Sequence, residues 1–223
     1  MQRAGEMVEF RLGSAERPLR RILCLGAHCD DIEIGCGGTI LRLLSKDPNI
    51  EVYWKVFSST AVRKREALRG AKLFLAGAKK KRIAIHKYRD RFFPSLQPHI
   101  KAEFDKLKKQ FAPDVILTHY RHDLHQDHRV INELTWNTFR NHLILEYEIP
   151  KYDGDLGAPN FFVAMDRETC KRKAECIWDA FASQRAKQWF TLDTFMALPR
   201  IRGIEANSAG GFAEGFHCRK LSL

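Results

Sequence analysis

Two short segments of the chain gather side chains that could bind a metal ion. Residues 26–38 read GAHCDDIEIGCGG, and residues 119–128 read HYRHDLHQDH, with four histidines and two aspartates in ten positions. Burying so many polar groups is costly unless each finds a partner, so a binding site explains them better than packing does. Two imidazoles and one carboxylate leave a coordination position open for water, which is the arrangement that a hydrolytic zinc site needs.

The same set of ligands leaves other chemistry open. Two histidines and one carboxylate also describe non-haem iron enzymes, although those usually have an all-β architecture. The chain has no serine-nucleophile elbow of the form G-x-S-x-G. Gly35, Gly37 and Gly38 match no phosphate-binding pattern, so we interpret them as turn and packing positions.

Each segment follows a short apolar run that predicts a buried strand, at residues 22–27 and 115–118. Further strands are expected at residues 51–57, 82–85, 143–149 and 161–165, and helices at residues 39–44, 62–76, 100–111, 129–142 and 167–184. This alternation predicts a single-domain, Rossmann-like α/β fold, with a mostly parallel sheet and helices on both faces. In such sheets the active site lies at the carboxyl ends of the strands, where both segments begin.

Length and composition agree with one catalytic domain. The chain has 223 residues, of which 44% are apolar, enough for one sizeable core. We expect residues 1–20 to be an N-terminal extension and residues 21–223 to form the domain. No apolar run is long enough to span a bilayer, and the first residues lack the pattern of a secretion signal, so a cytoplasmic location is expected. The six cysteines form no C-x-x-C pair and are expected to be reduced.

The formal net charge is +11. The basic residues are scattered along the chain, which favours attraction of an anionic small-molecule substrate over binding of nucleic acid. A non-catalytic nucleotide- or nucleic-acid-binding module that uses this charge is the alternative from a different class of protein.

Both metal-binding segments resemble the signatures of a known family. AHCDDIEIGCGG resembles the A-H-P-D-D-x-E-x-G-x-G-G motif of the PIG-L/LmbE-like zinc-dependent N-acetylglucosaminyl deacetylases, and DLHQDH resembles their D-x-H-x-D-H motif. Supporting similarity comes from VRKREALRGA, EYEIPKYDGDLG and AEGF, so the resemblance covers most of the chain from about residue 21.

The resemblance implies a site and a reaction. Spacing alone cannot choose between Asp30 and Asp31; the family pattern implies that His28, Asp31 and His128 bind Zn²⁺ and that Asp30 is the general base. The reaction implied is removal of an N-acetyl group from an amino-sugar compound of the N-acetylglucosamine type, linked to a nucleotide, lipid or glycan. Homo-oligomers are frequent among similar proteins.

Other positions carry roles in the family pattern. His125 is implied to face the developing oxyanion, Asp127 to orient His125, and Arg63 to lie near the substrate. The sequence departs from the family at Cys29, which replaces a proline and brings a thiol close to the metal; we expect it not to be a ligand. His119 and His122 are either further site residues or caps of backbone groups.

Overall fold

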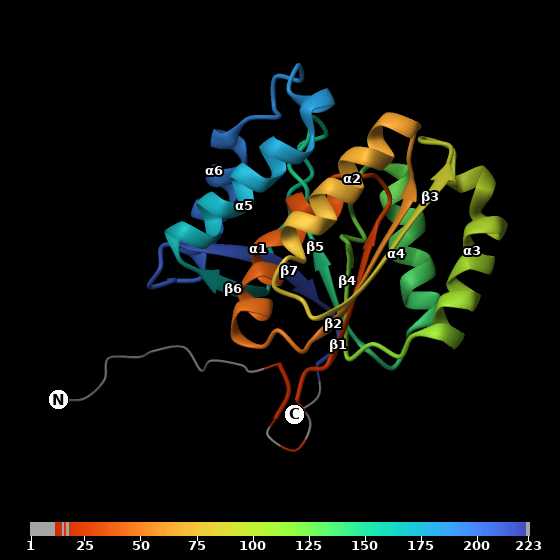
Figure 1. Ribbon diagram of the computed structural model, residues 1–223, viewed down its shortest axis with the longest axis horizontal. Helices are drawn as coiled ribbons and strands as arrows, with labels where there is room; N and C mark the ends of the chain where they lie inside the picture. Colours follow the sequence, from red (N-terminus) through yellow and green to blue (C-terminus); the bar gives the residue numbers. More distant parts are fainter. Residues whose placement is uncertain (1–11, 15, 17, 222–223) are drawn as a thin grey trace.

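The computed structural model describes residues 12–14, 16 and 18–221 (Figure 1). Within these residues, a seven-stranded sheet has the order β3-β2-β1-β4-β5-β7-β6. Its strands are β1 (Arg21–Gly26), β2 (Glu51–Ser58), β3 (Lys80–Tyr88), β4 (Val115–His119), β5 (Leu143–Tyr147), β6 (Phe161–Met165) and β7 (Phe212–Cys218).

Helices cover both faces of the sheet, as Figure 1 shows. On one face, α1 and α2 pack together with α5, which in turn contacts α6; on the other face, α3 packs against α4. Their bounds are α1 (Asp31–Lys46), α2 (Ala61–Phe74), α3 (Phe93–Gln110), α4 (Gln126–Thr138), α5 (Arg167–Ala180) and α6 (Leu192–Glu205), with a short 3₁₀ helix, η1, at Ala182–Gln184.

The central strand β1 shows why the sheet is buried on both sides. Ile22 and Cys24 belong to the hydrophobic core under α1 and α2, whereas Leu23 and Leu25 belong to the core under α3 and α4. Successive side chains of a strand point to opposite faces, so a continuous apolar run is required when helices cover both. The apolar run in the sequence therefore has a direct structural cause.

The strand order reverses beside β1. From β1 the chain proceeds through β2 to β3 on one side, then crosses to β4 and β5 on the other, and all of these neighbours are parallel. The loops after β1 and β4 therefore open from adjacent strands at the same edge, which is where ligands bind in open α/β sheets. The predicted α/β fold with a mostly parallel sheet is confirmed.

Three features differ from the expectations or lie beyond them. The first helix begins at Asp31, earlier than its apolar spacing indicated, and the fourth begins at Gln126. The chain also forms α6 and β7, which were not expected, and β7 runs antiparallel to both β5 and β6. Most of the expected N-terminal extension, residues 1–20, lies outside the described residues.

None of the helices in the described ranges has the length and apolar character needed to cross a membrane.

Candidate metal centre

The two segments come together because each leads from a strand through a short loop into a helix. After β1, the chain makes a short loop that carries His28, and α1 begins at Asp31. After β4, the N-cap of α4 is His125, whose Nδ1 accepts the backbone N–H of Asp127 at 3.2 Å. Because residues three apart share one face of a helix, His125 and His128 point the same way, and their rings stack with centroids 4.6 Å apart.

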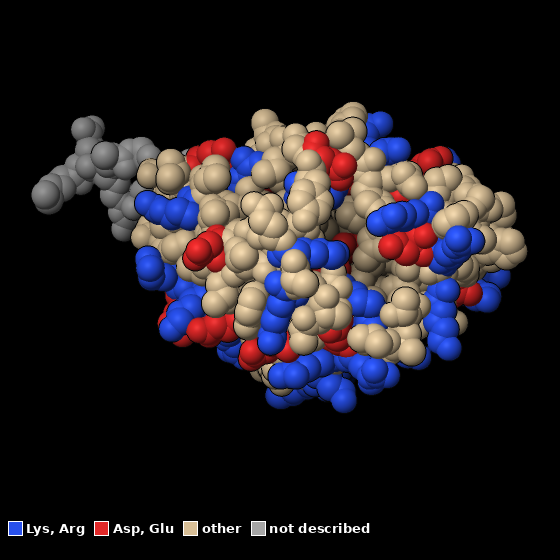
Figure 2. All heavy atoms as spheres, turned by 90° about the horizontal axis from the view of Figure 1, so that it is seen from above, with Lys and Arg blue, Asp and Glu red and all other residues tan. Residues whose placement is uncertain are grey.

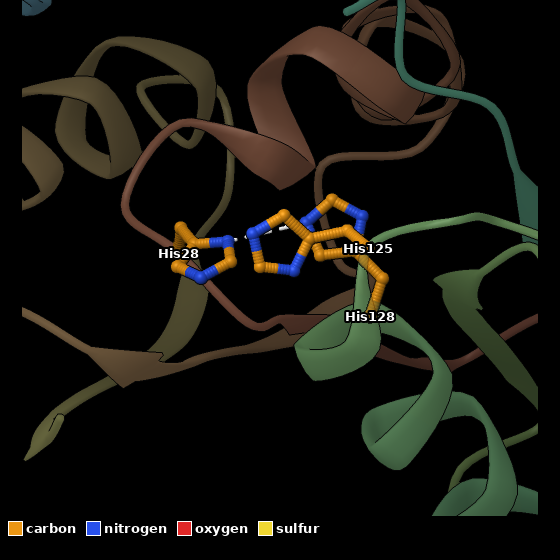
Figure 3. Close-up of side chains that lie close together, drawn as sticks. All are labelled: His28, His125 and His128. Carbon is orange, nitrogen blue, oxygen red and sulfur yellow. Dashed lines mark hydrogen bonds between the residues drawn. The ribbon is translucent and has the colours of Figure 1, made fainter. Parts of the chain in front are cut away.

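Three candidate ligand atoms, one each from His28, Asp31 and His128, converge. His28 Nδ1 lies 3.1 Å from His128 Nε2, and Asp31 Oδ2 lies 3.5 Å from the first atom and 3.6 Å from the second. Figure 3 shows the side chains of His28, His125 and His128 close together, with a dashed line joining the rings of His28 and His128. Ligand atoms at zinc bond lengths in tetrahedral geometry are about 3.3 Å apart, so this triangle has the size of a zinc site.

Neighbouring carboxylates fix which imidazole nitrogens are free. His128 Nδ1 lies 2.8 Å from Asp123 Oδ2, and His28 Nε2 lies 3.0 Å from Asp90 Oδ1 and 3.2 Å from Asp127 Oδ2. An ionised carboxylate only accepts hydrogen bonds, so each of these ring nitrogens carries the proton of its neutral imidazole. The opposite nitrogens then present lone pairs to the centre of the triangle, as metal-binding histidines do.

Burial and charge shift the pKa values of these groups. Burial, with the neighbouring His119, lowers the pKa of His128 to about 3, so this ring is neutral at neutral pH. Burial alone would raise the pKa of Asp31, but His128, His119 and His28 hold it well below its usual value. Burial opposes protonation of His28, yet Asp31, Asp127 and Asp90 raise its pKa well above the usual value. The carboxylates around His28 therefore favour a positive charge at this point of the fold.

The donor set therefore fits a divalent cation. Two imidazole nitrogens and one carboxylate oxygen converge, while the outer nitrogen of each ring is held by another carboxylate. Three protein ligands leave a position open for water or substrate, as in catalytic zinc sites. The sequence-predicted ligands His28, Asp31 and His128 thus lie together at one point of the fold.

Asp30, the predicted general base, forms an ion pair with Arg63. Its Oδ2 is 3.0 Å from Nη2 of Arg63, near the start of α2. Arg63 is itself held by Glu66 at 2.7 Å and lies over the ring of Phe181, 5.1 Å from its centroid. The structure thus brings Asp30 and Arg63, two of the predicted site residues, into direct contact.

Asp127 lies at the site and holds both His28 and the loop before α3. Its Oδ2 accepts the backbone N–H of Arg91 at 2.6 Å and its Oδ1 that of Phe93 at 3.1 Å, and Oδ2 also lies 3.2 Å from His28 Nε2. The backbone N–H of Asp127 donates to His125 Nδ1, and a carboxylate oxygen of Asp127 lies within 4.8 Å of a ring nitrogen of His125. That the Asp127 carboxylate orients His125 stays a prediction.

His119 and Cys29 support the site from inside. His119 is fully buried and stacks on His128 with centroids 3.9 Å apart. Its Nε2 accepts the backbone N–H of Ala27 at 2.9 Å. The Cys29 thiol donates to the carbonyl oxygen of Ser58 at 3.2 Å. The thiol is thereby bonded to the end of β2, and that Cys29 is not a ligand stays a prediction.

Sequence reasoning missed Asp123 and Asp90 as partners of the ligands. Asp123 is buried, and its carboxylate also lies 3.1 Å from Lys151 Nζ. Burial alone would raise the pKa of Asp123, but His128, His119 and Lys151 outweigh this effect and lower it. A signal for Asp123 existed, because it is the first residue of the D-x-H-x-D-H motif. Asp90 lies in no motif, so only the fold brings it to His28.

The surface is hollowed at one end of the molecule. Figure 2 shows the molecule from the end at which the parallel strands finish, where the surface is hollowed near its middle. Acidic side chains lie at the bottom of the hollow, and Lys and Arg side chains surround it. The surface thus offers basic groups around an acidic centre, which suits an anionic molecule approaching a cation.

Three comparisons place this geometry among known proteins. The family model described as "PIG-L: GlcNAc-PI de-N-acetylase" matches residues 23–139, more than half of the chain. The uncharacterized deacetylase YaiS of Escherichia coli (strain K12) is 29% identical over 154 residues, which cover 65% of this chain and 82% of the relative.

Solved structures share the fold. The N,N'-diacetylchitobiose deacetylase of Pyrococcus horikoshii superposes with a TM-score of 0.67 at 21% identity, covering 90% of this chain and 84% of that one. GalB, the 4-carboxy-2-hydroxymuconate hydratase of Pseudomonas putida KT2440, superposes with a TM-score of 0.69 at 15% identity, covering 92% and 98%. A fold that carries both reactions does not decide between them.

The family match includes both metal-binding segments and favours the deacetylase reaction over the hydratase reaction. It also sets aside the alternative of a non-catalytic binding module. The chain belongs to the PIG-L family and is a metal-dependent deacetylase.

Proposed function

We propose that this deacetylase removes the acetyl group from the nitrogen of an N-acetylated amino sugar and uses Zn²⁺ bound by His28, Asp31 and His128. The observation that carries the proposal is the triangle of ligand atoms, with sides of 3.1, 3.5 and 3.6 Å. A zinc ion held there would lower the pKa of water and polarise the amide carbonyl.

Asp30 is the proton carrier in this proposal. It adjoins the ligand Asp31, and Arg63 holds its carboxylate at 3.0 Å without taking part in the triangle. As the water oxygen bonds to the acetyl carbon, Asp30 accepts the proton of the water. The C–N bond then breaks, and Asp30 returns this proton to the departing nitrogen. The products are acetate and the free amino sugar.

His125 is the donor for the carbonyl oxygen. Its Nδ1 accepts a backbone N–H, so the neutral ring carries its proton on Nε2. Burial and the nearby His28 lower the pKa of His125, which keeps the ring neutral at neutral pH. A fixed N–H donor next to the ligands can stabilise negative charge that develops on the acetyl oxygen. Arg63, which pairs with Asp30, is proposed to contact the sugar.

The test is a screen for acetate released from acetylated amino sugars, offered free, nucleotide-linked, lipid-linked and glycan-linked. We expect turnover of at least one class of substrate. Exhaustive chelation should abolish this turnover. After the chelator has been removed, added Zn²⁺ should restore it and added Fe²⁺ should not. Activity that survives chelation would contradict the mechanism, and recovery with iron alone would favour the non-haem iron alternative.

A variant test locates the metal. His128→Ala should lose most of the bound metal, measured by elemental analysis, because a ligand is removed. His122→Ala is the matched control, since His122 is exposed in the same loop and its ring packs against Tyr120 instead of the ligands. Full metal content in the His128 variant would refute the assignment.

A further inference from the structure

Asp90 is an acidic residue outside both motifs that reaches the metal centre. It lies in the loop between β3 and α3, and its carboxylate is 3.0 Å from Nε2 of His28. Its side chain is 56% exposed, whereas those of Asp31 and Asp127 are almost completely buried. Among the groups around the ligands, Asp90 is therefore a carboxylate at the boundary with solvent.

The loop is held firmly enough to present Asp90 to His28. The backbone N–H groups of Arg91 and Phe93 donate to the two oxygens of Asp127, and the side-chain amide of Gln126 donates to the carbonyl oxygen of Arg91 at 3.0 Å. Phe93 is fully buried. These contacts attach the loop to the start of α4, the helix that carries His128.

The backbone at Arg91 is strained, which supports a functional reason for the loop conformation. Its φ angle is +68°, in the left-handed region that residues other than glycine rarely adopt. Such conformations are unfavourable and persist where surrounding contacts impose them, commonly at functional sites. Here the contact that imposes the conformation is the hydrogen bond from the Arg91 N–H to Asp127. This bond also places the preceding residue, Asp90, against His28.

The Nε2–H of His28 meets two carboxylates of different character. Asp127 already accepts a backbone N–H on each oxygen, so its charge is shared among several donors. Within the part of the chain that the structure describes, His28 is the hydrogen-bond partner found for the Asp90 carboxylate. A carboxylate on the outer nitrogen fixes the tautomer and the ring direction of a metal-binding histidine and makes it a better ligand.

We propose that Asp90 is a positioning residue of the metal centre, which holds Nε2–H of His28 and thereby keeps Nδ1 directed at the cation and slows its loss. The proposal rests on the proposed function in one respect, namely that His28 is a ligand. It goes beyond it because it makes the β3–α3 loop part of the metal site. Asp127 retains part of the hold on His28, so loss of Asp90 weakens metal binding without abolishing it.

The experiment measures metal binding directly, in the full chain. Asp90→Ala, Asp90→Asn and Asp90→Glu are compared with the unmodified protein by competition for Zn²⁺ with a chromophoric chelator and by the rate at which excess chelator removes the metal. We expect affinity to fall about 10- to 100-fold in the Ala variant, less in the Asn variant, and to recover largely in the Glu variant. The absorption bands of bound Co²⁺ should shift in the Ala and Asn variants, since the His28 ligand is less firmly directed.

Two controls separate this role from others. Asp153→Asn removes the same charge from an exposed position in the loop after β5 and should leave affinity unchanged. Repeating the titrations at high salt tests whether Asp90 acts through its charge at a distance, because salt screens such an effect but leaves a hydrogen bond largely intact. Circular dichroism of the metal-free variants checks that each is folded.

Several outcomes overturn the proposal. Metal affinity and release rate unchanged in both Ala and Asn variants would remove Asp90 from the site, while leaving the proposed function intact if His128→Ala still loses its metal. A second equivalent of metal that disappears with Asp90 would make Asp90 a ligand instead of a positioning residue. If the loss of metal affinity in the Asp90 variants equals that in Asp153→Asn, or disappears at high salt, Asp90 acts only through its charge at a distance.

Discussion

Adjacent aspartates can perform different tasks only if the backbone turns between them. Here α1 begins at Asp31, whose Oδ2 accepts the backbone N–H of His28 at 2.6 Å and so stays beside the ligand rings. Asp30 precedes the helix and pairs with Arg63. Consecutive helical residues point about 100° apart, so the two carboxylates diverge. Spacing alone could not separate them, because both are acidic and they lie only two and three residues after His28.

This divergence gives a prediction for Asp30→Asn. The variant keeps size and can still accept the hydrogen bond from Arg63, but it cannot accept the proton of water. We expect kcat to fall about 10²- to 10⁴-fold with little change in KM, because general-base catalysis contributes on that order. Metal content, measured by elemental analysis, should stay full in this variant and drop in Asp31→Asn. If the metal contents of the two variants are reversed, the roles of the aspartates have been exchanged.

The sequence could indicate a site residue only when its partner lies nearby along the chain. His28 and Asp31, like His125 and His128, sit three residues apart, so a local motif carries each pair. Asp90 meets His28 from 62 residues away, and no spacing rule links them. Asp127 likewise has a partner that no spacing indicates, because His28 lies 99 residues away in the sequence.

At the scale of elements, helix α1 is interrupted close to the site. Cys36 has φ −144° and ψ 16°, outside the helical range. Lys173 of α5 donates to the carbonyl oxygen of Ile34 at 2.6 Å, and Glu214 of β7 accepts the N–H of Gly38 at 2.8 Å and of Thr39 at 2.7 Å. In an unbroken helix, these backbone N–H and carbonyl groups would bond to one another. Because the helix is interrupted, a buried ion pair from two other elements satisfies them instead.

The pair itself is short and fully enclosed, which predicts a large cost for breaking it. Lys173 Nζ lies 2.7 Å from Glu214 Oε1, and both side chains are 3% exposed. Glu214→Gln leaves a buried ammonium without its counter-charge, which typically costs about 3–5 kcal/mol. We expect that loss in the free energy of unfolding, measured by urea denaturation, and partial recovery in the double variant with Lys173→Met.

The matched control is an exposed pair on the same helix, Lys171 and Glu175, which are 3.7 Å apart. Glu175→Gln should cost at most about 1 kcal/mol, because exposed ion pairs contribute little. Equal losses in Glu214→Gln and Glu175→Gln would contradict the role given to the buried pair.

The same elements explain why the C-terminal part of the fold was not predicted. Strand β7 reads FAEGFHC, and its buried Glu214 and Gly215 interrupt the apolar pattern by which a strand is detected. Helix α6 contains Pro199 and leaves Ile201 and Ile204 exposed, so its apolar residues do not form one stripe. The parallel strands were predictable because helices bury both of their faces, and that leaves a continuous apolar run in the sequence.

At the scale of the whole molecule, the charge of +11 is distributed over a surface whose hollow has an acidic bottom and a basic surround. Arg89 and Arg91 lie in the loop beside the metal centre, and Arg121 follows β4; all three are exposed. A field of this sign raises the rate at which anions reach the hollow, whereas it has little effect on neutral molecules. The net charge thus affects recognition of the group to which the amino sugar is linked. The residues of the two motifs do not recognise that group.

We therefore expect salt to affect anionic and neutral substrates differently. When ionic strength rises from about 0.02 M to about 0.3 M, the Debye length shortens several-fold, and kcat/KM for an acetylated amino sugar linked to a phosphate or nucleotide should fall about tenfold. The loss should appear in KM, because screening weakens capture and leaves the bond-breaking steps alone. The neutral sugar with the same acetamide is the control, and its kcat/KM should stay constant over the same range. If both substrates respond alike, the basic surround of the hollow plays no part in selecting them, and the net charge serves another purpose.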